Sequence, residues 1–209
     1  ELKTQEIFSL LNQLKEIGCF YLGFTGGEPF MREDIIEILW YAKRCGFELI
    51  IYTNGSLINE NIAGQLARLR PNKVDITIPA MSKDAFERIS GVPGSRDKVF
   101  RAIDLLHKKG VNLGFKTCVL KENEKEIEEI QDFAASLSVP HRLDDMLAPC
   151  LDGSREPYKY RGKMTDGRRQ RSEVRGQRSE VRRKREFIDC DLEGNHRTPT
   201  TETLFKCGV

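Results

Sequence analysis

The segment Thr25-Gly26-Gly27-Glu28-Pro29 has the residue types of a ligand-binding loop. It follows a short apolar run over residues 19–24, which we predict to be a strand. Two successive glycines let a backbone approach a ligand closely, and the Glu28 carboxylate is a suitable acceptor for an ammonium or hydroxyl group. The same residues are also typical of a tight turn from a strand into a helix that Pro29 opens. The sequence alone leaves both interpretations open.

Polar residues also accompany three later strand-like runs. Thr53-Asn54-Gly55 closes the second run, Thr77 lies near the end of the third, and Lys116-Thr117 lies within the fourth. Taken alone, an Asn-Gly pair is an ordinary turn former. In α/β folds, however, ligands bind where parallel strands end and the following loops begin. We therefore expect these polar residues and the glycine-containing loop to share one rim of a sheet.

Helical and strand-like patterns alternate over the first 150 residues. Predicted helices cover residues 7–17, 35–46, 62–69, 99–109 and 124–137, and predicted strands cover 19–24, 48–52, 74–78, 113–120 and 141–147. Strands that alternate with helices of this length pair in parallel through right-handed crossovers. The fold class is therefore α/β, as either an open doubly wound sheet or a (β/α) barrel, and hydrophobic periodicity does not distinguish the two.

The composition limits the class of protein. The chain has 209 residues, 39% of them hydrophobic, and a formal net charge of +2. This suits one domain with an appendage and argues against a whole-chain electrostatic role on nucleic acid or membrane. No apolar run approaches the roughly 18 residues needed to span a bilayer, and the first residues lack the regions of a signal peptide. We expect a cytoplasmic protein.

A basic insert interrupts the pattern at residues 161–186. Between Arg161 and Arg185 there are 11 basic and three acidic residues, a local charge of +8. Two near-identical heptapeptides, 170–176 and 177–183, each contain a single valine, which is too little to form a core. We expect a solvated helix or a disordered segment without chemistry. Nucleic-acid contact is the minor alternative, because the segment has no aromatic residue to stack on bases.

Together the motifs resemble the core of radical S-adenosylmethionine enzymes of the SPASM-bearing group. The resemblance covers most of residues 1–160, the predicted core domain, and continues on the far side of the insert in residues 187–209, which are similar to the start of a cluster-binding extension. It rests on the following segments: residues 25–29, 53–55, 74–78, 91–95, 116–117, 151–157 and 204–208.

The resemblance implies a partial (β/α)6 barrel that lacks its first strand. It also implies a [4Fe-4S] cluster, whose open iron holds S-adenosylmethionine and cleaves it reductively to a 5'-deoxyadenosyl radical. The radical would modify a peptide or small metabolite, with an electron donor such as a flavodoxin or ferredoxin. On this pattern Gly26, Gly27 and Glu28, followed by Pro29, hold the methionyl ammonium. The remaining residues implied to face the cofactor are Thr53, Asn54 and Thr77, with Lys116 and Thr117 as further polar contacts.

The cysteines depart from the family pattern. The family's radical-forming cluster is held by a C-x3-C-x2-C motif on the loop after the first strand, and none of the six cysteines here has that spacing. We expect the cysteines that hold this cluster to lie upstream of the given residues. We also expect the chain alone to be inactive. Cys207 is implied as the first auxiliary-cluster ligand, with Cys190 as another candidate. A second interpretation is a non-catalytic, truncated remnant of such an enzyme. No role is assigned to His107, His141 or His196.

Overall fold

The computed structural model describes residues 2–144, 147–150 and 152–162. Most of the predicted insert (from residue 163) and all of 187–209, with Cys190 and Cys207, lie outside the described residues. The strands are β1 (Tyr21–Phe24), β2 (Glu48–Thr53), β3 (Lys73–Thr77), β4 (Leu113–Cys118) and β5 (His141–Asp144). The α-helices are α1 (Thr4–Glu16), α2 (Ile35–Arg44), α3 (Glu60–Leu69), α4 (Lys83–Ser90), α5 (Ser95–Lys108) and α6 (Ile127–Ser136). The short 3₁₀ helices are η1 (Pro29–Met31), η2 (Glu124–Glu126) and η3 (Glu156–Tyr160).

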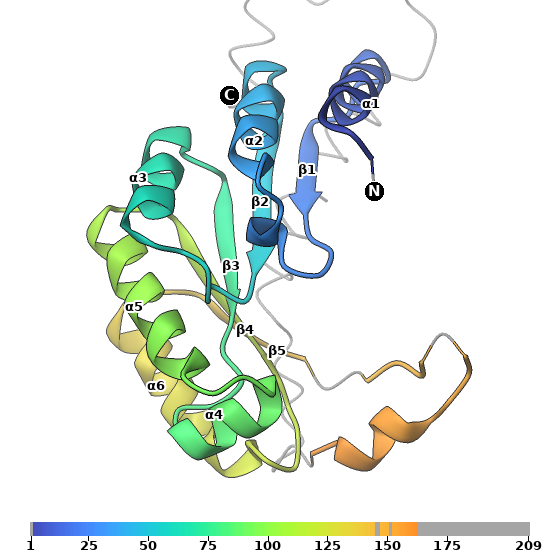
Figure 1. Ribbon diagram of the computed structural model, residues 1–209. Coiled ribbons are helices and arrows are strands. Elements are labelled where there is room, and N and C mark those ends of the chain that lie inside the picture. The colour runs from blue at the N-terminus through green and yellow to red at the C-terminus, as the bar shows by residue number, and fades with distance from the viewer. Residues whose placement is uncertain (1, 145–146, 151, 163–209) are drawn as a thin grey trace, which may run out of the picture. The chain divides into compact units, whose positions relative to one another are not determined.

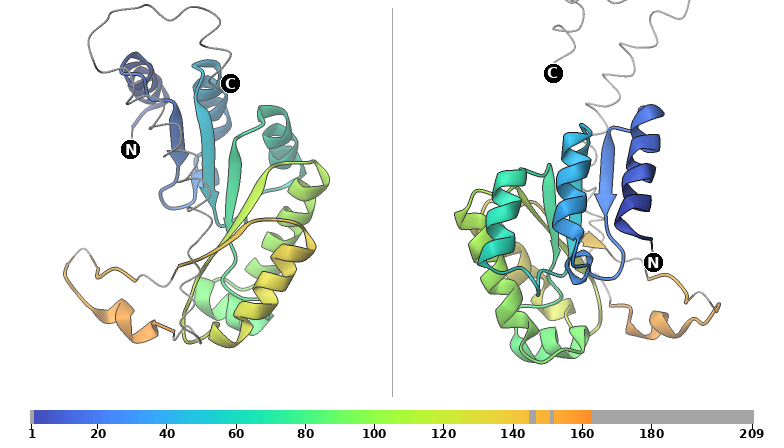
Figure 2. Two further views of the ribbon diagram at one scale, coloured as in Figure 1. Left: turned by 180° about the vertical axis from the view of Figure 1, so that it is seen from behind. Right: turned by 45° about the horizontal axis from the view of Figure 1, so that its top comes forward.

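The five strands form one parallel sheet in the order β1-β2-β3-β4-β5 (Figure 1). A doubly wound sheet reverses its strand order at a switch point, whereas a barrel keeps the order of the chain. The view from behind shows the strands in front of α2 and α3, which cover the other face (Figure 2). The fold is therefore a partial (β/α) barrel, and the barrel alternative of the two predicted architectures is confirmed.

The two faces of the sheet differ in chemistry. Side chains alternate along a strand, and one set, including Leu49, Ile51, Ile76 and Phe115, is fully buried under the helices. The Phe115 ring, for example, stacks on Phe133 of α6 with ring centroids 5.8 Å apart. The opposite set is largely polar, and we call that side the open face. Its residues include Tyr52, Lys73, Asp75, Lys116 and Asp144.

A glycine in β4 makes room for an ion pair on the open face. Lys73 Nζ lies 2.9 Å from Asp75 Oδ2, and Asp75 is only 5% exposed. A Cβ placed on Gly114 would lie 2.8 Å from Asp75 Oδ1 and 2.9 Å from Lys73 Cδ. Any side chain there would displace the pair and uncover a buried carboxylate, which explains a glycine in the interior of a strand.

The connection between β3 and β4 differs from the prediction. One helix was predicted there, over residues 99–109, but the structure has two, α4 and α5, separated by a turn in which Gly91 and Gly94 have φ values of 69° and 74°. Helix α4 is eight residues long and buries only Ala85 and Phe86. Two apolar positions are too few to give a clear helical period in the sequence. Likewise, the predicted helix 124–137 begins with the 3₁₀ turn η2 before α6.

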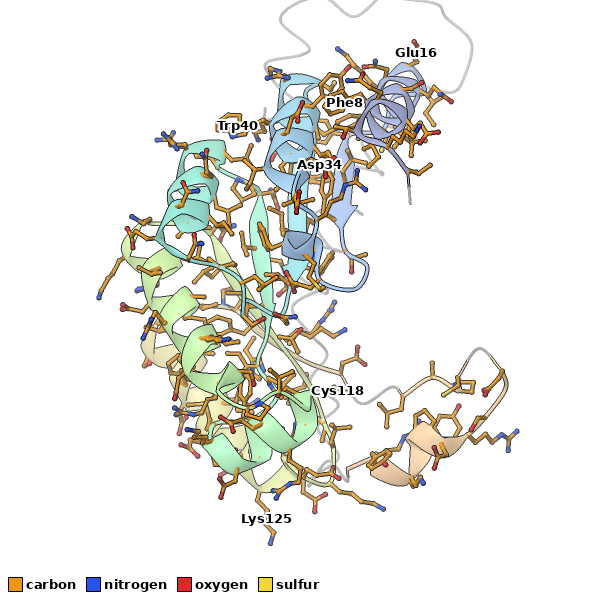
Figure 3. All side chains as sticks on the ribbon, in the orientation of Figure 1. Phe8, Glu16, Asp34, Trp40, Cys118 and Lys125 are labelled. Carbon is orange, nitrogen blue, oxygen red and sulfur yellow. The ribbon has the colours of Figure 1, made fainter. Side chains whose placement is uncertain are left out.

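Helix α1 is anchored beside the glycine-containing loop. Arg32 Nη1 donates to the Leu2 carbonyl at 3.0 Å, and the Thr4 hydroxyl donates to Asp34 Oδ2 at 2.5 Å. Hydrogen bonds from Arg32 and Thr4 hold the pKa of Asp34 below its ordinary value. Phe8 stacks on Tyr41 of α2 with ring centroids 4.0 Å apart, and Asp34 and Phe8 are labelled in Figure 3. The start of α1 is thereby fixed next to the rim.

Within the described ranges, none of the helices has the length and apolar character that crossing a lipid bilayer requires.

Candidate functional site

The loop after β1 and the end of β2 meet at the Glu28 carboxylate. Glu28 Oε1 accepts a hydrogen bond from the Thr53 hydroxyl at 2.6 Å and a longer one from the Phe30 N–H at 3.3 Å. Glu28 Oε2 accepts from the Asn54 N–H at 2.7 Å. The rim predicted from the strand ends is therefore present, and Glu28, Thr53 and Asn54 belong to one cluster.

The loop also performs the structural role that the sequence left open. Pro29 is the first residue of η1, and the Glu28 side chain caps that turn through the Phe30 N–H. Pro29 and Phe30 are buried. The turn and ligand interpretations are thus compatible, because the same loop opens a short helix and presents its glycines at the rim.

The backbone conformation of the loop accounts for a glycine at position 26 but not at position 27. Gly26 has a φ of 140°, a conformation that side chains other than glycine's rarely adopt. Gly27 has no such φ, and a Cβ built on it meets no atom within 4 Å. Neither backbone strain nor packing among the described residues therefore explains the missing side chain at Gly27.

A cavity of about 240 Å³ lies against this loop, between α1, β1 and α2. Its wall is largely apolar, with the loop as its polar part. The lining residues are Ile7, Phe24, Thr25, Gly27, Glu28, Pro29, Arg32, Ile35 and Ile38. A concave apolar wall with a few converging polar groups is the usual form of a small-molecule site.

Asn54 and Thr53 differ in what they can offer a ligand. The Thr53 side chain is buried and donates to Glu28, while its oxygen accepts from the Gly55 N–H at 2.9 Å. The Asn54 side-chain oxygen accepts from the N–H and the hydroxyl of Ser56 at 2.8 and 2.7 Å. The two N–H groups of the exposed Asn54 amide have no partner among the described residues, so they can donate to a ligand.

Thr77, at the end of β3, and Lys116, in β4, lie side by side on the open face. They are register partners, and Thr77 is exposed. Lys116 Nζ lies 3.2 Å from Asp144 Oδ2, and the two side chains are 35% and 32% exposed. Lys116 thus presents a solvated cation on the side of the sheet that the helices leave uncovered.

Thr117 lies apart from the other predicted rim residues. It is fully buried on the helix-covered face, where its hydroxyl donates to the Ile78 carbonyl at 2.7 Å. Successive strand residues point to opposite faces, so Lys116 and Thr117 do not share one. The expectation that both contact one cofactor has no support from this arrangement, because the Thr117 hydroxyl is taken up within the protein.

His141, to which the sequence analysis gave no role, is the other partner of Thr117. Its Nε2 lies 2.9 Å from Thr117 Oγ1. Because the Thr117 proton goes to Ile78, His141 Nε2 must carry the hydrogen and donate it. His141 Nδ1 is buried and has no partner among the described residues. Burial lowers the pKa of His141, and the nearby Asp75 charge only partly opposes this, so the ring is held neutral.

We expect the folded chain to lose stability as the pH falls from 7 to about 5.5, below the ordinary histidine pKa of 6.5. The pKa of His141 is lower in the folded chain, so protons bind the unfolded chain preferentially in this window. Urea unfolding at several pH values measures the loss, and His141→Gln, which keeps a donor to Thr117, should reduce it. His107→Gln, a change in an exposed histidine, should leave it intact. An equal pH dependence in both variants would contradict the assignment to His141.

Asn123 and Glu126 hold the chain that leaves β3. The buried Asn123 amide donates to the Pro79 and Cys118 carbonyls at 2.6 and 2.8 Å and accepts from the Leu120 N–H at 2.8 Å. Glu126 accepts from the Met81 N–H, the Ser82 N–H and the Ser82 hydroxyl at 2.7, 3.0 and 2.6 Å. Burial opposes ionisation of Glu126, but these hydrogen bonds outweigh it and lower its pKa. The two side chains fix the rim loop after β3.

Glu126→Gln is expected to lower the free energy of unfolding by about 1–2 kcal/mol at pH 7, because charge-assisted hydrogen bonds to Ser82 and Met81 are lost. The pKa of Glu126 is lowered on folding, so its contribution is present above the ordinary value of 4.5 and is lost as the pH falls through the folded value. Unfolding curves at pH 7 and pH 3.5 test this, with the exposed Glu129→Gln as control. A deficit that persists undiminished at pH 3.5 would count against an ionised Glu126.

The described cysteines do not form a cluster site. Among the described residues, Cys19, Cys45, Cys118 and Cys150 are not joined in disulfide bonds. In the described part of the chain, no group of three or more His, Cys, Asp or Glu side chains is arranged to hold a metal ion. The residues described therefore do not fit a [4Fe-4S] cluster.

Known proteins resemble this chain in sequence or in fold. The chain is 32% identical over 130 residues to an AdoMet-dependent heme synthase of Oleidesulfovibrio alaskensis, a match covering 62% of this chain and 34% of that protein. SuiB of Streptococcus suis bound to S-adenosylmethionine superposes with a TM-score of 0.60 at 19% identity, covering 66% of this chain and 32% of SuiB. The protein anSMEcpe, with bound AdoMet and the Cp18Cys peptide, superposes with a TM-score of 0.64 at 19% identity, covering 78% of this chain and 48% of the other.

The family match concerns the part of the chain that carries most of the sheet and its rim. The chain spans about a third of the length of the heme synthase that it matches. The family model for the Radical SAM superfamily matches residues 1–134, which include β1 to β4 and the glycine loop. Because that match covers well over half of the 209 residues, the chain belongs to the Radical SAM superfamily.

Proposed function

We propose that this chain binds S-adenosylmethionine on the rim formed by the ends of β1, β2 and β4, as part of an enzyme of the SPASM-bearing group. The observation that carries the proposal is Gly27, which lines a cavity and at which a Cβ would meet no described atom within 4 Å. Membership of the Radical SAM superfamily supports the identity of the ligand. The named ligand of the SuiB structure supports it as well.

The rim residues offer complementary groups to each end of a methionyl moiety. The loop from Gly26 to Glu28 supplies oxygen acceptors suited to the ammonium group. The unpartnered Asn54 amide and the Lys116 ammonium supply donors suited to the carboxylate, with the Thr77 hydroxyl beside Lys116. Thr53 contributes indirectly, through its hydrogen bond to Glu28.

Of the two open-face lysines, Lys116 is the one suited to a ligand. Its partner Asp144 is about one third exposed, and solvated ion pairs of this kind contribute only about 0–1 kcal/mol. Lys116 can therefore exchange that partner at little cost. Lys73 is paired with the buried Asp75, and withdrawing its charge would leave a carboxylate uncompensated away from water.

Reductive cleavage of bound S-adenosylmethionine supplies a 5'-deoxyadenosyl radical in this family, and the reaction proposed here is the radical modification of a peptide or a small molecule. The peptide in the anSMEcpe complex supports a peptide substrate, and the heme synthase supports a small one. The uncovered open face is the proposed place for the substrate. A flavodoxin or ferredoxin is the proposed electron donor, and auxiliary-cluster ligation by Cys190 and Cys207 stays a prediction.

Lys116→Met is expected to weaken binding of S-adenosylmethionine about tenfold, because the cation that pairs with the methionyl carboxylate is lost. Binding of 5'-methylthioadenosine, which lacks the amino-acid group, should be unchanged. Equilibrium dialysis with both labelled ligands measures the two affinities. Lys125→Met, a change at an exposed lysine labelled in Figure 3, is the control and should alter neither. An equal loss for both ligands would remove Lys116 from the carboxylate site.

A further inference from the structure

We propose that residues 155–162, which contain the short helix η3, form a docking surface for an acidic peptide at the exit of β4. We call these residues the η3 segment (η3 is the orange helix in Figure 1). The inference goes beyond the proposed function and rests on it only in taking the docked peptide for the substrate. Docking itself is measurable without S-adenosylmethionine.

The η3 segment is fastened to the loop that follows β4. The Val119 N–H donates to the carbonyl of Asp144, the last residue of β5, at 2.9 Å. Two residues further on, the Lys121 N–H donates to the Tyr160 carbonyl at 3.0 Å. The η3 segment thus takes over from β5 as the hydrogen-bonded neighbour of this chain, and its backbone has a defined place at the rim.

A glycine allows this close approach. Leu120 and Arg161 form an antiparallel bridge, and the Gly162 N–H donates to the Val119 carbonyl at 3.4 Å. A Cβ placed on Gly162 would lie 2.7 Å from the carbonyl carbon and oxygen of Leu120. A side chain at Gly162 would therefore push the two backbones apart, because both atoms it meets belong to the main chain.

Two tyrosines of the η3 segment are open to solvent and carry cations on their rings. Tyr158 and Tyr160 are 38% and 48% exposed. The Arg161 guanidinium lies 5.2 Å from the centroid of the Tyr158 ring, and Lys159 Nζ lies 5.8 Å from that of Tyr160. Stacking orients the guanidinium and leaves the N–H groups at its edge free to meet the two oxygens of a carboxylate.

Three exposed cations at this surface have no carboxylate partner in the part of the chain that the structure describes. They are Arg155, Arg161 and Lys121. Lys121 belongs to the surface because its backbone is bonded to the η3 segment. An unpaired guanidinium with a fixed orientation binds a carboxylate more strongly than a mobile ammonium does. The charges are therefore complementary to a ligand that carries carboxylates.

The neighbouring acids do not neutralise these cations. The Glu156 carboxylate is paired with Lys159. Asp152 Oδ1 accepts from the Ser154 N–H at 2.8 Å within its own turn. Glu122 directs one carboxylate oxygen, Oε2, into the protein, where it is buried. A polyanion such as a nucleic acid would pass these acids closely, whereas a peptide can place single carboxylates on the cations.

The shape of the surface also favours a peptide. Small-molecule sites are concave, but the tyrosines here are exposed on a short helix. Exposed tyrosines and arginines are the residue types that contribute most to contacts between polypeptides. The η3 segment joins the exit of β4, the strand that carries Lys116. A peptide docked there would have its adjoining residues next to the open face.

The test uses the full 209-residue chain and a capped hexapeptide of alternating glutamate and glycine. Resonances of the Tyr158 ring and the Arg161 Nε–H are followed by NMR during titration. We expect saturable shifts, which the same peptide with glutamine for glutamate should not produce. Arg161→Met should weaken the affinity reported by Tyr158 about tenfold, because the fork that meets the carboxylate is lost. Absent shifts, or equal shifts with the glutamine peptide, would overturn the proposal.

Two control variants separate a built surface from general charge attraction. Arg44→Met removes another exposed arginine that lies over a tyrosine, 5.7 Å from the centroid of Tyr41 on α2. Arg175→Met removes one charge from the basic insert. Both should leave the affinity reported by Tyr158 unchanged within about twofold. Equal losses in Arg175→Met and Arg161→Met, or stronger binding of an oligothymidylate than of the peptide, would count against a peptide surface.

Gly162→Ala tests the fastening of the η3 segment. Hydrogen exchange of the Lys121 N–H should accelerate about tenfold or more, and peptide binding should weaken, while the affinity for S-adenosylmethionine stays the same. Undiminished peptide binding together with faster exchange would contradict a surface that depends on the fastening. If the chain binds the peptide but not S-adenosylmethionine, the proposed function fails and the docking surface stands. The reverse result overturns the docking surface alone.

Discussion

Replacement of Gly27 by valine is expected to lower the affinity of the chain for S-adenosylmethionine at least about 100-fold, or about 2.7 kcal/mol, while its thermal midpoint stays within about 2 °C. A Cβ at Gly27 meets no described atom within 4 Å, and the backbone there does not have a positive φ. The fold therefore tolerates the substitution, and the added methyl groups occupy the space proposed for the ligand.

Gly27→Val is measured by calorimetric titration and differential scanning calorimetry. Gly64→Val is the matched control: Gly64 lies in α3, and a Cβ there also meets no atom within 4 Å. It should change stability by less than about 1 kcal/mol, because valine is no worse than glycine in a helix, and it should lose no affinity. Gly26 is unsuitable for this comparison, because its φ of 140° adds backbone strain to any substitution. Equal affinity of Gly27→Val and the unchanged chain would contradict a ligand at the glycine loop.

Asn123→Ala is expected to cause the largest loss of stability among single polar substitutions, about 3 kcal/mol, or a fall of roughly 6–12 °C in the thermal midpoint. The variant removes the hydrogen bonds that the Asn123 side chain makes to the Pro79 and Cys118 carbonyls and to the Leu120 N–H. Asn123 is fully buried. Each orphaned buried group costs roughly 1–3 kcal/mol.

Urea unfolding of Asn123→Ala gives the free energy directly. Asn61→Ala, at an exposed position of α3, is the control and should be neutral or slightly stabilising, because alanine favours helix. A loss below about 1 kcal/mol for Asn123→Ala would mean that water replaces the missing amide, and that Asn123 does not hold the exits of β3 and β4 together.

The order of the elements was predictable because their hydrophobic periods are strong. The strands begin and end within a few residues of the predicted limits, since buried residues such as Leu49, Ile51 and Ile76 dominate them. The strand order was not predictable in the same way. Doubly wound sheets and barrels bury the same alternating pattern, and only the pairing of β1 through β5 in chain order decides between them.

The location of the rim was predictable from the sequence, but the hydrogen bonds that its residues make were not. Residue types show that Glu28 accepts hydrogen bonds, yet only the fold shows that Thr53 and Asn54 supply them. The placement of Thr117 on the helix side follows from the two-residue period of a strand, a signal that was present in the sequence. No such signal marked His141, because its hydrogen-bond partner is the hydroxyl of Thr117, which lies 24 residues earlier in the chain.

Binding of S-adenosylmethionine to the unchanged chain, compared with Gly27→Val in the same titration, tests the central claim most directly. The account predicts saturable binding with one site per chain, lost in Gly27→Val and retained in Gly64→Val. Absence of saturable binding, or binding that Gly27→Val leaves unchanged, would contradict a cofactor site at the glycine loop.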